Sequence, residues 1–457
     1  MEQQPAPTQS YAHVKTPIPG PLSQALVARE APFLAPGTQN IWSLAGIAVE
    51  TGSGALLEDV DGNRFIDLVA GIGVASLGYR HPRQSAAIVR QAERLMVGSY
   101  TTAPRLSLLE RLARVTPAGS GLTRTQLYSG GAEAVESALR LARAHTGRFE
   151  VISFWGGFHG KTQGVLGLMG SDFKHGLGPQ QPGLHQVPYA DCYRCPFKLK
   201  YPECGLACVD FLREAIKKST TNSVAAIIVE PIQGTAGNIV PPDTYLPAVA
   251  EVAREIGALF ICDEMITGFG RSGTMFGCEQ SGARPDIITI GKALGGGYPV
   301  TGLITTDAIC RAEPWSKPSF SSSSYGGNPL AAAAADAAVA SVVEDDLPGN
   351  ARLVGARMLA ALEQMAERYP FVDAVRGRGL MLGLDLVRDK ATREPMSSAA
   401  CRRLFQAALR RGIITMAYAP RVRINPPLVI QADQADEAMG LLDEVFAEAM
   451  AEGSWRA

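Results

Sequence analysis

The chain has 457 residues, too many for one compact hydrophobic core, so its length predicts two or more domains. Lys and Arg number 43 against 44 Asp and Glu, and the net charge of −1 leaves no basic excess for binding nucleic acid. Hydrophobic residues make up 46%, which suits a globular protein, and the 48 glycines favour an α/β enzyme with many tight turns.

The first forty residues show no targeting signal. They are rich in Pro, Gln, Ala and Thr and lack an apolar stretch after Met1, so residues 1–40 are expected to form a flexible arm rather than a signal peptide. The longest apolar runs, Val224–Val229 and the alanine-rich Leu330–Val343, are too short or too weakly hydrophobic to span a bilayer. We therefore expect a cytoplasmic protein without membrane contact.

Two short strands come next in the chain. Ala55–Asp59 and Arg64–Leu68 flank the turn sequence Asp61-Gly62-Asn63, which predicts a β-hairpin. Helical periodicity follows at Gln84–Val97 and Leu106–Val115.

From about Thr125 the chain alternates short apolar strands with helical patterns. Continuous runs of Val and Ile between helices are typical of a mostly parallel sheet covered on both faces. The strands are expected at Thr125–Tyr128, Glu150–Phe154, Ala225–Val229, Ala258–Cys262, Asp286–Ile290 and Val300–Thr305, and the helices at Ala132–Ala144 and Tyr245–Ile256.

The composition changes near Leu347, and the remainder predicts a smaller α+β domain. Its helices are expected at Asn350–Arg368, Ala399–Arg411 and Ala435–Ala451, and its strands at Gly379–Val387 and Val422–Ile424.

Four of the eight cysteines crowd into one Pro- and Tyr-rich segment, CYRCPFKLKYPECGLAC. Cys192 and Cys195 form a C-x2-C pair, and Cys204 and Cys208 form a C-x3-C pair, which is spacing typical of metal ligands. The segment is therefore expected to hold zinc or an iron–sulfur cluster, which spacing cannot separate. Disulfides and free thiols are the alternatives, and a reducing cytoplasm disfavours disulfides.

Three chemical features fall at the carboxyl ends of predicted strands, where open α/β sheets bind ligands. Ser129-Gly130-Gly131-Ala132-Glu133 can cradle a phosphate on backbone amides at a helix N-terminus, although an ordinary tight turn explains such a run equally well. Asp263 could hold a ring nitrogen protonated, or simply cap a helix. Lys292 could become a nucleophile through desolvation, or be a surface lysine. Together the three favour pyridoxal phosphate, which needs a phosphate site, an acid and a Schiff-base lysine.

The motifs SGGAEAVE, FHGKT, EPIQG, DEMITGFGRSG, GKALGGGYP and YGGNPLA resemble, in order and spacing, the class III (ω-type) aminotransferases of pyridoxal-phosphate fold type I. The resemblance runs from about Leu57 to Ile430 and implies an α/β fold with a large, mostly parallel-sheet domain and a smaller α+β domain. The expected divisions are an N-terminal arm at 1–40, part of the small domain at 41–95, the large cofactor-binding domain at 96–346 with a Cys-rich insertion at 190–208, and the rest of the small domain at 347–457.

The resemblance also implies the catalytic roles. Lys292 would be the Schiff-base lysine and then the base that moves the substrate proton, and Asp263 would pair with the pyridine nitrogen. Gly131 and Ala132 would offer amides to the phosphate. Ser324 stands where the family usually has a Thr that reaches the phosphate of the neighbouring subunit, which implies a homodimer with shared sites, or a tetramer.

Four further residues are expected around the cofactor by the same resemblance. Phe158 would stack on its ring, Glu230 would lie near its hydroxyl side, and Met265 would pack beneath the ring together with Ile266. His159 beside Phe158 could be mistaken for a catalytic base, but the resemblance implies a mainly structural role.

The substrate side departs from the family pattern. γ-Aminobutyrate and ornithine aminotransferases usually have a second Glu five residues after that of EPxQG, where it masks a carboxylate-binding Arg. Here that position is Thr235, while the Arg is retained as Arg423, so Arg423 is expected to bind a substrate carboxylate directly.

The chain also resembles 2,2-dialkylglycine decarboxylase, a decarboxylating relative. That enzyme has a Gln where this sequence has Ile72, and a Trp where Phe158 stands. Because an apolar side chain cannot orient a carboxylate for cleavage, Ile72 argues for transamination. Some members of the family carry iron–sulfur centres near the subunit interface, which slightly favours a cluster over zinc in the Cys-rich insertion.

The resulting hypothesis is a pyridoxal 5′-phosphate-dependent aminotransferase. It would move an amino group from an ω-amino acid, a diamine or an amino acid to a 2-oxo acid such as 2-oxoglutarate or pyruvate. A decarboxylase, racemase or mutase on the same scaffold is the alternative. A nucleotide- or cluster-binding protein of another class is disfavoured, because no GxGxxG or GxxxxGK[ST] motif is present.

Overall fold

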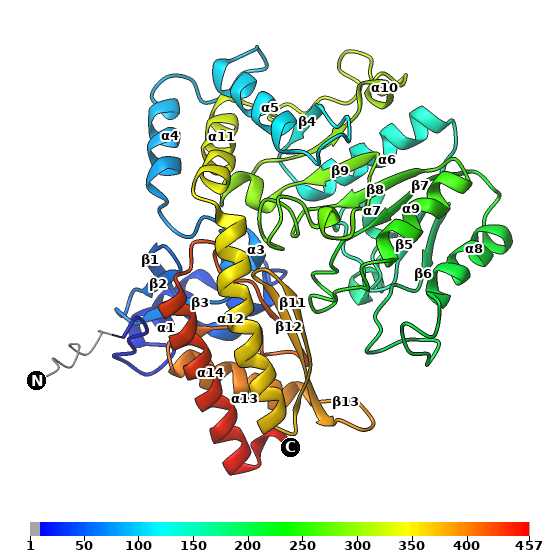
Figure 1. The fold of residues 1–457 in the computed structure, drawn as a ribbon. Coiled ribbons are helices and arrows are strands. Elements are labelled where there is room, and N and C mark those ends of the chain that lie inside the picture. The colour runs from blue at the N-terminus through cyan, green and yellow to red at the C-terminus, as the bar shows by residue number, and fades with distance from the viewer. Residues whose placement is uncertain (1–9, 457) are drawn as a thin grey trace, which may run out of the picture.

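The computed structural model describes residues 10–456, which contain a seven-stranded sheet and two four-stranded sheets with helices packed against them (Figure 1). The seven-stranded sheet has the order β4-β10-β9-β8-β7-β5-β6. Neighbours from β9 to β6 run parallel, whereas β10 is antiparallel to both β4 and β9. Its strands are β4 (Arg124–Tyr128), β5 (Glu150–Phe154), β6 (Leu184–Val187), β7 (Val224–Val229), β8 (Leu259–Asp263), β9 (Ile287–Ile290) and β10 (Thr301–Thr305).

The predicted mostly parallel sheet is therefore confirmed, with β6 as the strand that the pattern missed. The sequence of β6, Leu-His-Gln-Val, is half polar and gives no apolar run, because the strand lies at the sheet edge and only Val187 is fully buried.

Helices cover both faces of this sheet, as its apolar strands require. On β7 the adjacent Ile227 and Ile228 are both fully buried but belong to different hydrophobic clusters, because successive side chains of a strand point to opposite faces. Ile228 packs in the cluster of α6 (Gly131–Thr146), and Ile227 in that of α8 (Ala207–Ser219) and α9 (Tyr245–Glu255).

The two smaller sheets combine segments from both halves of the chain. One has the order β1-β2-β3-β14, in which the predicted hairpin pairs antiparallel and β14 adds parallel to β3. In the other, β12 pairs with β11, β13 and β15. The strands are β1 (Val49–Ser53), β2 (Leu56–Asp59), β3 (Arg64–Asp67), β11 (Val372–Arg378), β12 (Met381–Asp389), β13 (Glu394–Pro395), β14 (Ile413–Ile414) and β15 (Arg421–Ile424).

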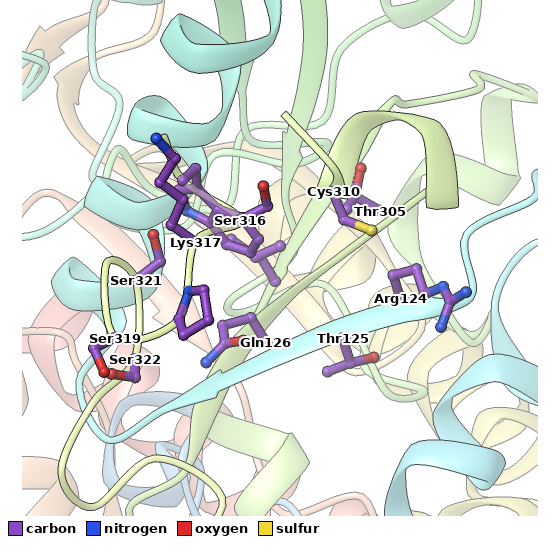
Figure 2. Close-up of a pocket in the computed structure, with 13 residues that line it drawn as sticks. Arg124, Thr125, Gln126, Thr305, Cys310, Ser316, Lys317, Ser319, Ser321 and Ser322 are labelled. Atoms are coloured by element: carbon purple, nitrogen blue, oxygen red, sulfur yellow. The ribbon is translucent and has the colours of Figure 1, made fainter. Parts of the chain in front are cut away.

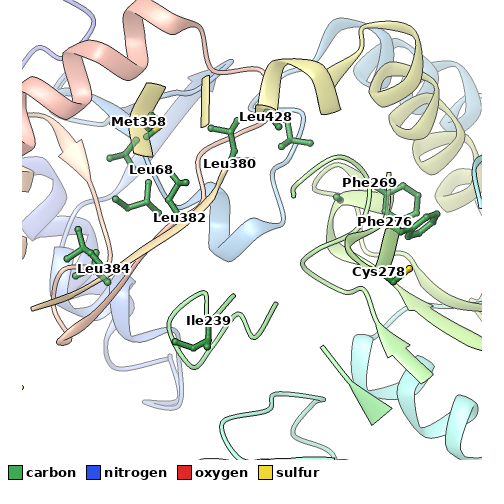
Figure 3. Packing of buried hydrophobic residues seen from close by; sticks show 14 of the residues in the cluster. Leu68, Ile239, Phe269, Phe276, Cys278, Met358, Leu380, Leu382, Leu384 and Leu428 are labelled. Carbon is green, nitrogen blue, oxygen red and sulfur yellow. The ribbon is translucent and has the colours of Figure 1, made fainter. Parts of the chain in front are cut away.

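Long helices pack on these sheets and against each other. Figure 1 shows α12 and α14 side by side along the smaller sheets, and Figure 3 shows leucines of β12 packed with Met358 of α12 and Leu428. The longer helices outside the large sheet are α4 (Pro82–Ala92), α5 (Ala103–Val115), α11 (Pro329–Glu344), α12 (Leu347–Arg368), α13 (Ser398–Arg410) and α14 (Ala432–Glu452). The short ones are α2 (Asn40–Ala45), α3 (Ala70–Gly73), α7 (Gln163–Leu166) and α10 (Asp307–Cys310).

Helix α11 is the alanine-rich run whose role the sequence left open. Its small side chains are buried on most of its surface, which allows close packing against α4, α5 and the turn that carries Lys292. Asn328 caps it by accepting a hydrogen bond from the Ala331 amide at 2.9 Å. Neither α11 nor any other helix within residues 10–456 combines the length and the apolar character needed to cross a membrane.

The part of the N-terminal segment that the structure describes packs against the small domain. It contains α1 (Pro21–Glu30), whose first turn is held by Asp61, because the Asp61 carboxylate accepts hydrogen bonds from the Leu22 and Ser23 amides at 2.8 and 2.9 Å. We expected a flexible arm over 1–40; residues 10–12 and the start of α1 make hydrogen bonds to later parts of the chain, and residues 1–9 lie outside the described chain.

Candidate active site

A cavity of about 480 Å³ opens at the carboxyl ends of β7, β8 and β9, where a parallel sheet is expected to bind its ligand. It brings together nine of the residues singled out from the sequence. These are Ile72, Phe158, Glu230, Thr235, Asp263, Met265, Ile266, Lys292 and Arg423.

Lys292 is separated from the end of β9 by Gly291 alone, and it begins a 3-10 turn (Lys292–Gly295). Its φ of +42° lies in the left-handed region, which a lysine rarely adopts and which is more often seen at functional sites. Burial lowers the pKa of its amine, against the opposing effect of Asp263 and Glu230, which makes the neutral nucleophilic form more accessible than in a free lysine. Within residues 10–456 no group forms a hydrogen bond or ion pair with this amine.

Asp263 ends β8, and its carboxylate is fully enclosed. Oδ1 accepts hydrogen bonds from Thr289 Oγ1 at 2.9 Å and from the Met265 amide at 3.2 Å, while Oδ2 accepts from His159 Nδ1 at 2.7 Å. Burial alone would raise the pKa of Asp263, but the hydrogen bond and charge of His159, together with Lys292 and Thr289, lower it overall. The carboxylate therefore remains ionised inside the protein.

His159 is itself buried, and its pKa is raised because the bond to Asp263 outweighs the effect of burial. It does not line the cavity. The structure thus gives this histidine a defined partner: it acts on the site through Asp263 and not as a base facing a substrate.

The glycine-rich turn precedes α6 as predicted. The Glu133 side chain folds back to accept hydrogen bonds from the Ser129 and Gly130 amides at 3.1 and 3.3 Å. The amides of Gly131 and Ala132 then lie at the first helical positions, where the helix dipole favours an anion. Thr301 Oγ1 fixes the turn by donating to the Gly130 carbonyl at 2.9 Å.

Glu230 joins two loops of the cavity wall. It follows β7, and its carboxylate accepts hydrogen bonds from the Phe158 amide at 2.8 Å and the Gly234 amide at 3.0 Å. The pKa of Glu230 is raised, mainly by burial. Phe158 lies edge-on to Phe173 with ring centroids 5.6 Å apart, and Met265 also lines the cavity.

Arg423 extends from β15 to the cavity, with Tyr418 as its nearest polar neighbour there. Burial lowers the pKa of Arg423, although a guanidinium stays charged at neutral pH. No carboxylate within residues 10–456 forms an ion pair with Arg423. Thr235, which stands where γ-aminobutyrate and ornithine aminotransferases usually have the masking Glu, lines the same cavity. The guanidinium is therefore available for an external carboxylate.

The sequence reasoning missed several residues of the lining. Lys161, the Lys of FHGKT, was given no role, yet it lines the cavity and lies 5.9 Å from the centroid of the Phe173 ring. Tyr418 and the segment Thr38–Asn40 were also missed. Only the motif position of Lys161 could have suggested it, since the others lie outside the motifs quoted above.

Ser324 lies outside this cavity and is exposed, as is the neighbouring Tyr325 with 64% of its surface accessible. In its own subunit Ser324 is therefore placed at the surface, away from Lys292.

The four cysteines expected to bind a metal surround a separate cavity of about 20 Å³. Cys192, Cys195, Cys204 and Cys208 are free thiols. Burial, helped by neighbouring thiols, raises the pKa of Cys192 and of Cys208 to about 11. Across residues 10–456 no group of three or more His, Cys, Asp or Glu side chains is placed to hold a metal ion. The predicted zinc or iron–sulfur site is therefore not supported.

Another hollow, of about 350 Å³, lies beside the edge strand β4 (Figure 2). Its two cationic side chains are already paired, Arg124 with Asp307 and Lys317 with Glu313. The rest of its lining is mainly hydroxyl and amide groups, without a carboxylate or a histidine. The residues singled out from the sequence thus gather around Lys292 and not here.

The family follows from a comparison with known proteins, because the family model for class-III aminotransferases matches residues 38–446. The chain belongs to the class-III aminotransferases. Its α/β architecture is accordingly that of the fold type I enzymes that depend on pyridoxal phosphate, with an amino donor and a 2-oxo acid as substrates.

Individual relatives of this class-III aminotransferase differ in their named activities. A leucine/methionine racemase of Thermococcus litoralis is 33% identical over 88% of this chain and 91% of its own length. A 4-aminobutyrate aminotransferase of Mycobacterium bovis is 33% identical over 97% of this chain and 100% of its own length. The crystal structure of an (S)-enantioselective ω-transaminase from Thermomicrobium roseum has a TM-score of 0.85 and 34% identity, over 94% of this chain and 98% of that one.

The cavity of this class-III aminotransferase fits pyridoxal phosphate by the chemistry of its groups. Lys292 supplies an amine that has no hydrogen-bond partner among the described residues and whose pKa is lowered. Asp263 supplies a carboxylate held ionised in a buried site, and the start of α6 supplies amides for a phosphate. An amine, a carboxylate and an anion site after the ends of β9, β8 and β4 are the groups that this cofactor requires.

Proposed function

We propose that this class-III aminotransferase transfers the amino group of an ω-amino acid, a diamine or an amino acid to a 2-oxo acid, with 2-oxoglutarate favoured over pyruvate as acceptor. The observation that carries the proposal is the pair of cations, Arg423 and Lys161, that line the same cavity as Lys292. Two cations suit an acceptor with two carboxylates, whereas pyruvate has one.

Bound pyridoxal phosphate supplies the electron sink that makes the Cα proton of an amino substrate acidic. Lys292 would hold this cofactor, and its amine would carry the substrate proton. The ionised carboxylate of Asp263 would pair with the ring nitrogen and keep it protonated, and the amides of Gly131 and Ala132 would bind the phosphate. Phe158, Glu230 and Met265 would line the space around the ring and exclude water.

Arg423 binds the substrate carboxylate in a planar, bidentate pair, which orients Cα toward Lys292. Thr235 carries no charge, so nothing has to leave the guanidinium before an α-carboxylate binds. Ile72 offers no hydrogen bond to a carboxylate, which supports loss of the proton over loss of carbon dioxide.

We further propose a homodimer with shared active sites, with a tetramer as the alternative. Ser324 is exposed in its own subunit, and the exposed segment beside α4 includes Leu95, Met96 and Val97, whose accessible fractions are 47%, 56% and 51%. Such apolar exposure favours a subunit contact. The free state of all eight cysteines fits the reducing cytoplasm.

The test is a panel of amino donors with 2-oxoglutarate or pyruvate, with detection of the product amino acid. We expect glutamate to form from 2-oxoglutarate at a higher kcat/KM than alanine from pyruvate. One relative is a named racemase, so the same donors are incubated without a 2-oxo acid. Epimerisation or carbon dioxide release in that control, without transamination in the panel, would overturn the proposal.

A further inference from the structure

Asp385 is a buried carboxylate surrounded by three guanidinium groups. It lies on β12, and its side chain is 1% exposed. Arg194 Nε and Nη2 both lie 3.0 Å from its Oδ2, Arg376 Nη1 lies 2.8 Å from Oδ1, and Arg421 Nε lies 3.9 Å from Oδ2. None of these four residues lines the cavity of Lys292, so the proposed reaction leaves the cluster unexplained.

Two of the arginines hold the backbone of the loop 234–238. Arg376 donates from Nη2 and Nε to the Gly237 carbonyl at 2.7 and 3.1 Å, and Arg421 donates from Nη1 to the Ala236 carbonyl at 2.9 Å. Thr235, the neighbour of Ala236, lines the active-site cavity. The two arginines therefore hold the backbone of the loop at residues 236 and 237, next to the residue that lines the active-site cavity.

The same cluster holds the strand of Arg423. In the antiparallel pair β12–β15, Asp385 is opposite Arg421 and Gly383 is opposite Arg423. The loop packs directly on this pair, because a Cβ added to Gly383 would lie 2.5 Å from the Gly237 carbonyl oxygen. The position of Thr235 relative to Arg423 is thus set by contacts around Asp385.

The third arginine ties the Cys-rich insertion to this cluster. Besides Asp385, Arg194 contacts the Arg393 carbonyl at 2.9 Å, and its own amide donates to Asp191 Oδ1 at 3.1 Å. Asp191 Oδ2 in turn accepts from Arg421 Nη2 at 2.8 Å. The insertion is therefore connected to the loop 234–238 and to β15 through Asp191 and Arg194 near its start, and none of these contacts involves its cysteines.

We propose that Arg194 and Asp191 of the insertion, acting through Asp385 and Arg421, are positioning residues that fix the distance between Thr235 and the Arg423 guanidinium and so determine affinity for the substrate carboxylate. This inference rests on the proposed role of Arg423. Salt bridges among buried groups of this kind define a geometry more than they add stability, since their desolvation offsets much of their attraction.

The experiment compares five holoenzyme variants with the wild type, and Arg423→Ala among them tests the carboxylate site itself. Arg194→Ala removes both contacts to Asp385, Arg194→Lys keeps one charge in their place, and Asp191→Asn removes the charge facing Arg421 while preserving its shape. Arg213→Ala is the matched control, because Arg213 makes a similar two-nitrogen pair with Glu255, at 3.0 and 2.8 Å, on the helices α8 and α9.

The readouts are KM and kcat for 2-oxoglutarate, KM for an amine donor without a carboxylate, and amide hydrogen exchange of the peptide 233–239. For Arg194→Ala we expect KM for 2-oxoglutarate to rise about fivefold, within the range seen for residues that act through others, with kcat changed less than about twofold. The amine KM stays unchanged and the peptide exchanges faster. Asp191→Asn behaves similarly, Arg194→Lys recovers most of the affinity, and Arg213→Ala matches the wild type.

An unchanged KM for 2-oxoglutarate in both Arg194→Ala and Asp191→Asn would overturn the inference, provided that Arg423→Ala raises it. If Arg423→Ala also leaves that KM unchanged, the proposed carboxylate site itself is wrong. Equal rises for 2-oxoglutarate and for the amine would mean a general loosening of the fold and would also overturn the inference.

Discussion

His159 Nδ1 donates a hydrogen bond to Asp263 Oδ2 across 2.7 Å, and both side chains are 1% exposed. The pKa of Asp263 is lowered and that of His159 is raised, because each favours the charged form of the other against the effect of burial. His159 therefore keeps the Asp263 carboxylate negatively charged at the end of β8, although that carboxylate is buried.

The first prediction concerns the stability of the apoprotein with His159→Gln. The lowered pKa of Asp263 adds to the free energy of unfolding in full above the ordinary value of 3.8, and this stabilisation is lost as the pH falls. The raised pKa of His159 adds to it in full below 6.5, and this stabilisation is lost as the pH rises. The difference in Tm between wild type and variant should thus be largest between pH 3.8 and 6.5. Thermal unfolding followed by circular dichroism measures it, and a difference independent of pH would contradict the ion pair.

The holoenzyme of the same variant should also change its pH–rate profile. Without the imidazole, burial dominates and the pKa of Asp263 rises, so the acid limb of kcat/KM should move to higher pH. The loss of activity is expected to be largest on the acid side of the profile and small at pH 7, because a rise of roughly one pKa unit moves the acid limb by about one pH unit. A uniform loss at every pH would mean that His159 only supports packing.

Asp263→Ala should abolish transamination while the fold persists, because an unprotonated ring loses its pull on the Cα electrons. We expect kcat to fall by about 10³-fold or more, equivalent to about 4 kcal/mol. Steady-state kinetics measure the loss, and circular dichroism checks the fold. Near-normal turnover in the variant would exclude the assigned role.

Lys292→Ala should remove the covalent attachment of the cofactor. Borohydride treatment of the wild-type holoenzyme, followed by peptide mass spectrometry, is expected to find the reduced cofactor on Lys292, and the variant should show neither that adduct nor turnover. Lys161→Ala is the matched control, since Lys161 lines the same cavity and should leave the adduct in place. An adduct on Lys161 in the wild type would refute the assignment.

Arg423→Ala should raise KM for 2-oxo acids by about 10- to 100-fold, as expected for losing a charge-assisted bond of roughly 1.5–3 kcal/mol. KM for simple amines should change little. Arg423→Lys retains the charge without the planar guanidinium, so its KM for 2-oxo acids should lie between those of the wild type and Arg423→Ala. Similar losses for acids and amines would indicate that Arg423 is structural.

Ser324→Ala should weaken binding of pyridoxal phosphate about fivefold, if its hydroxyl reaches the phosphate in the neighbouring subunit. Ser322→Ala, an exposed serine two residues earlier, is the control. Equilibrium dialysis gives the Kd, and analytical ultracentrifugation gives the oligomeric state. A monomeric holoenzyme with normal affinity would exclude shared sites.

Much of the site could be predicted because its chemistry is local. Asp263 and Lys292 each follow an apolar run directly, and parallel strands bring such ends to one edge of the sheet. The hairpin turn at Asp61–Asn63 and the glycine turn before α6 are encoded in the same local way. The cysteine spacing was equally local, but within residues 10–456 it yields no group placed to hold a metal ion, because spacing along the chain does not fix whether side chains converge.

The sequence by itself determined the alternating strands and helices, the places of Asp263 and Lys292 at the ends of two strands, and the family. Only the tertiary structure decided which side chains meet: His159 with Asp263, Lys161 with Arg423 in one cavity, and Asp385 with the arginines at 194, 376 and 421. These partners lie on different elements, and Lys161 and Arg423 are more than two hundred positions apart in the chain. Their distances follow from how strands and loops pack, which no local pattern records.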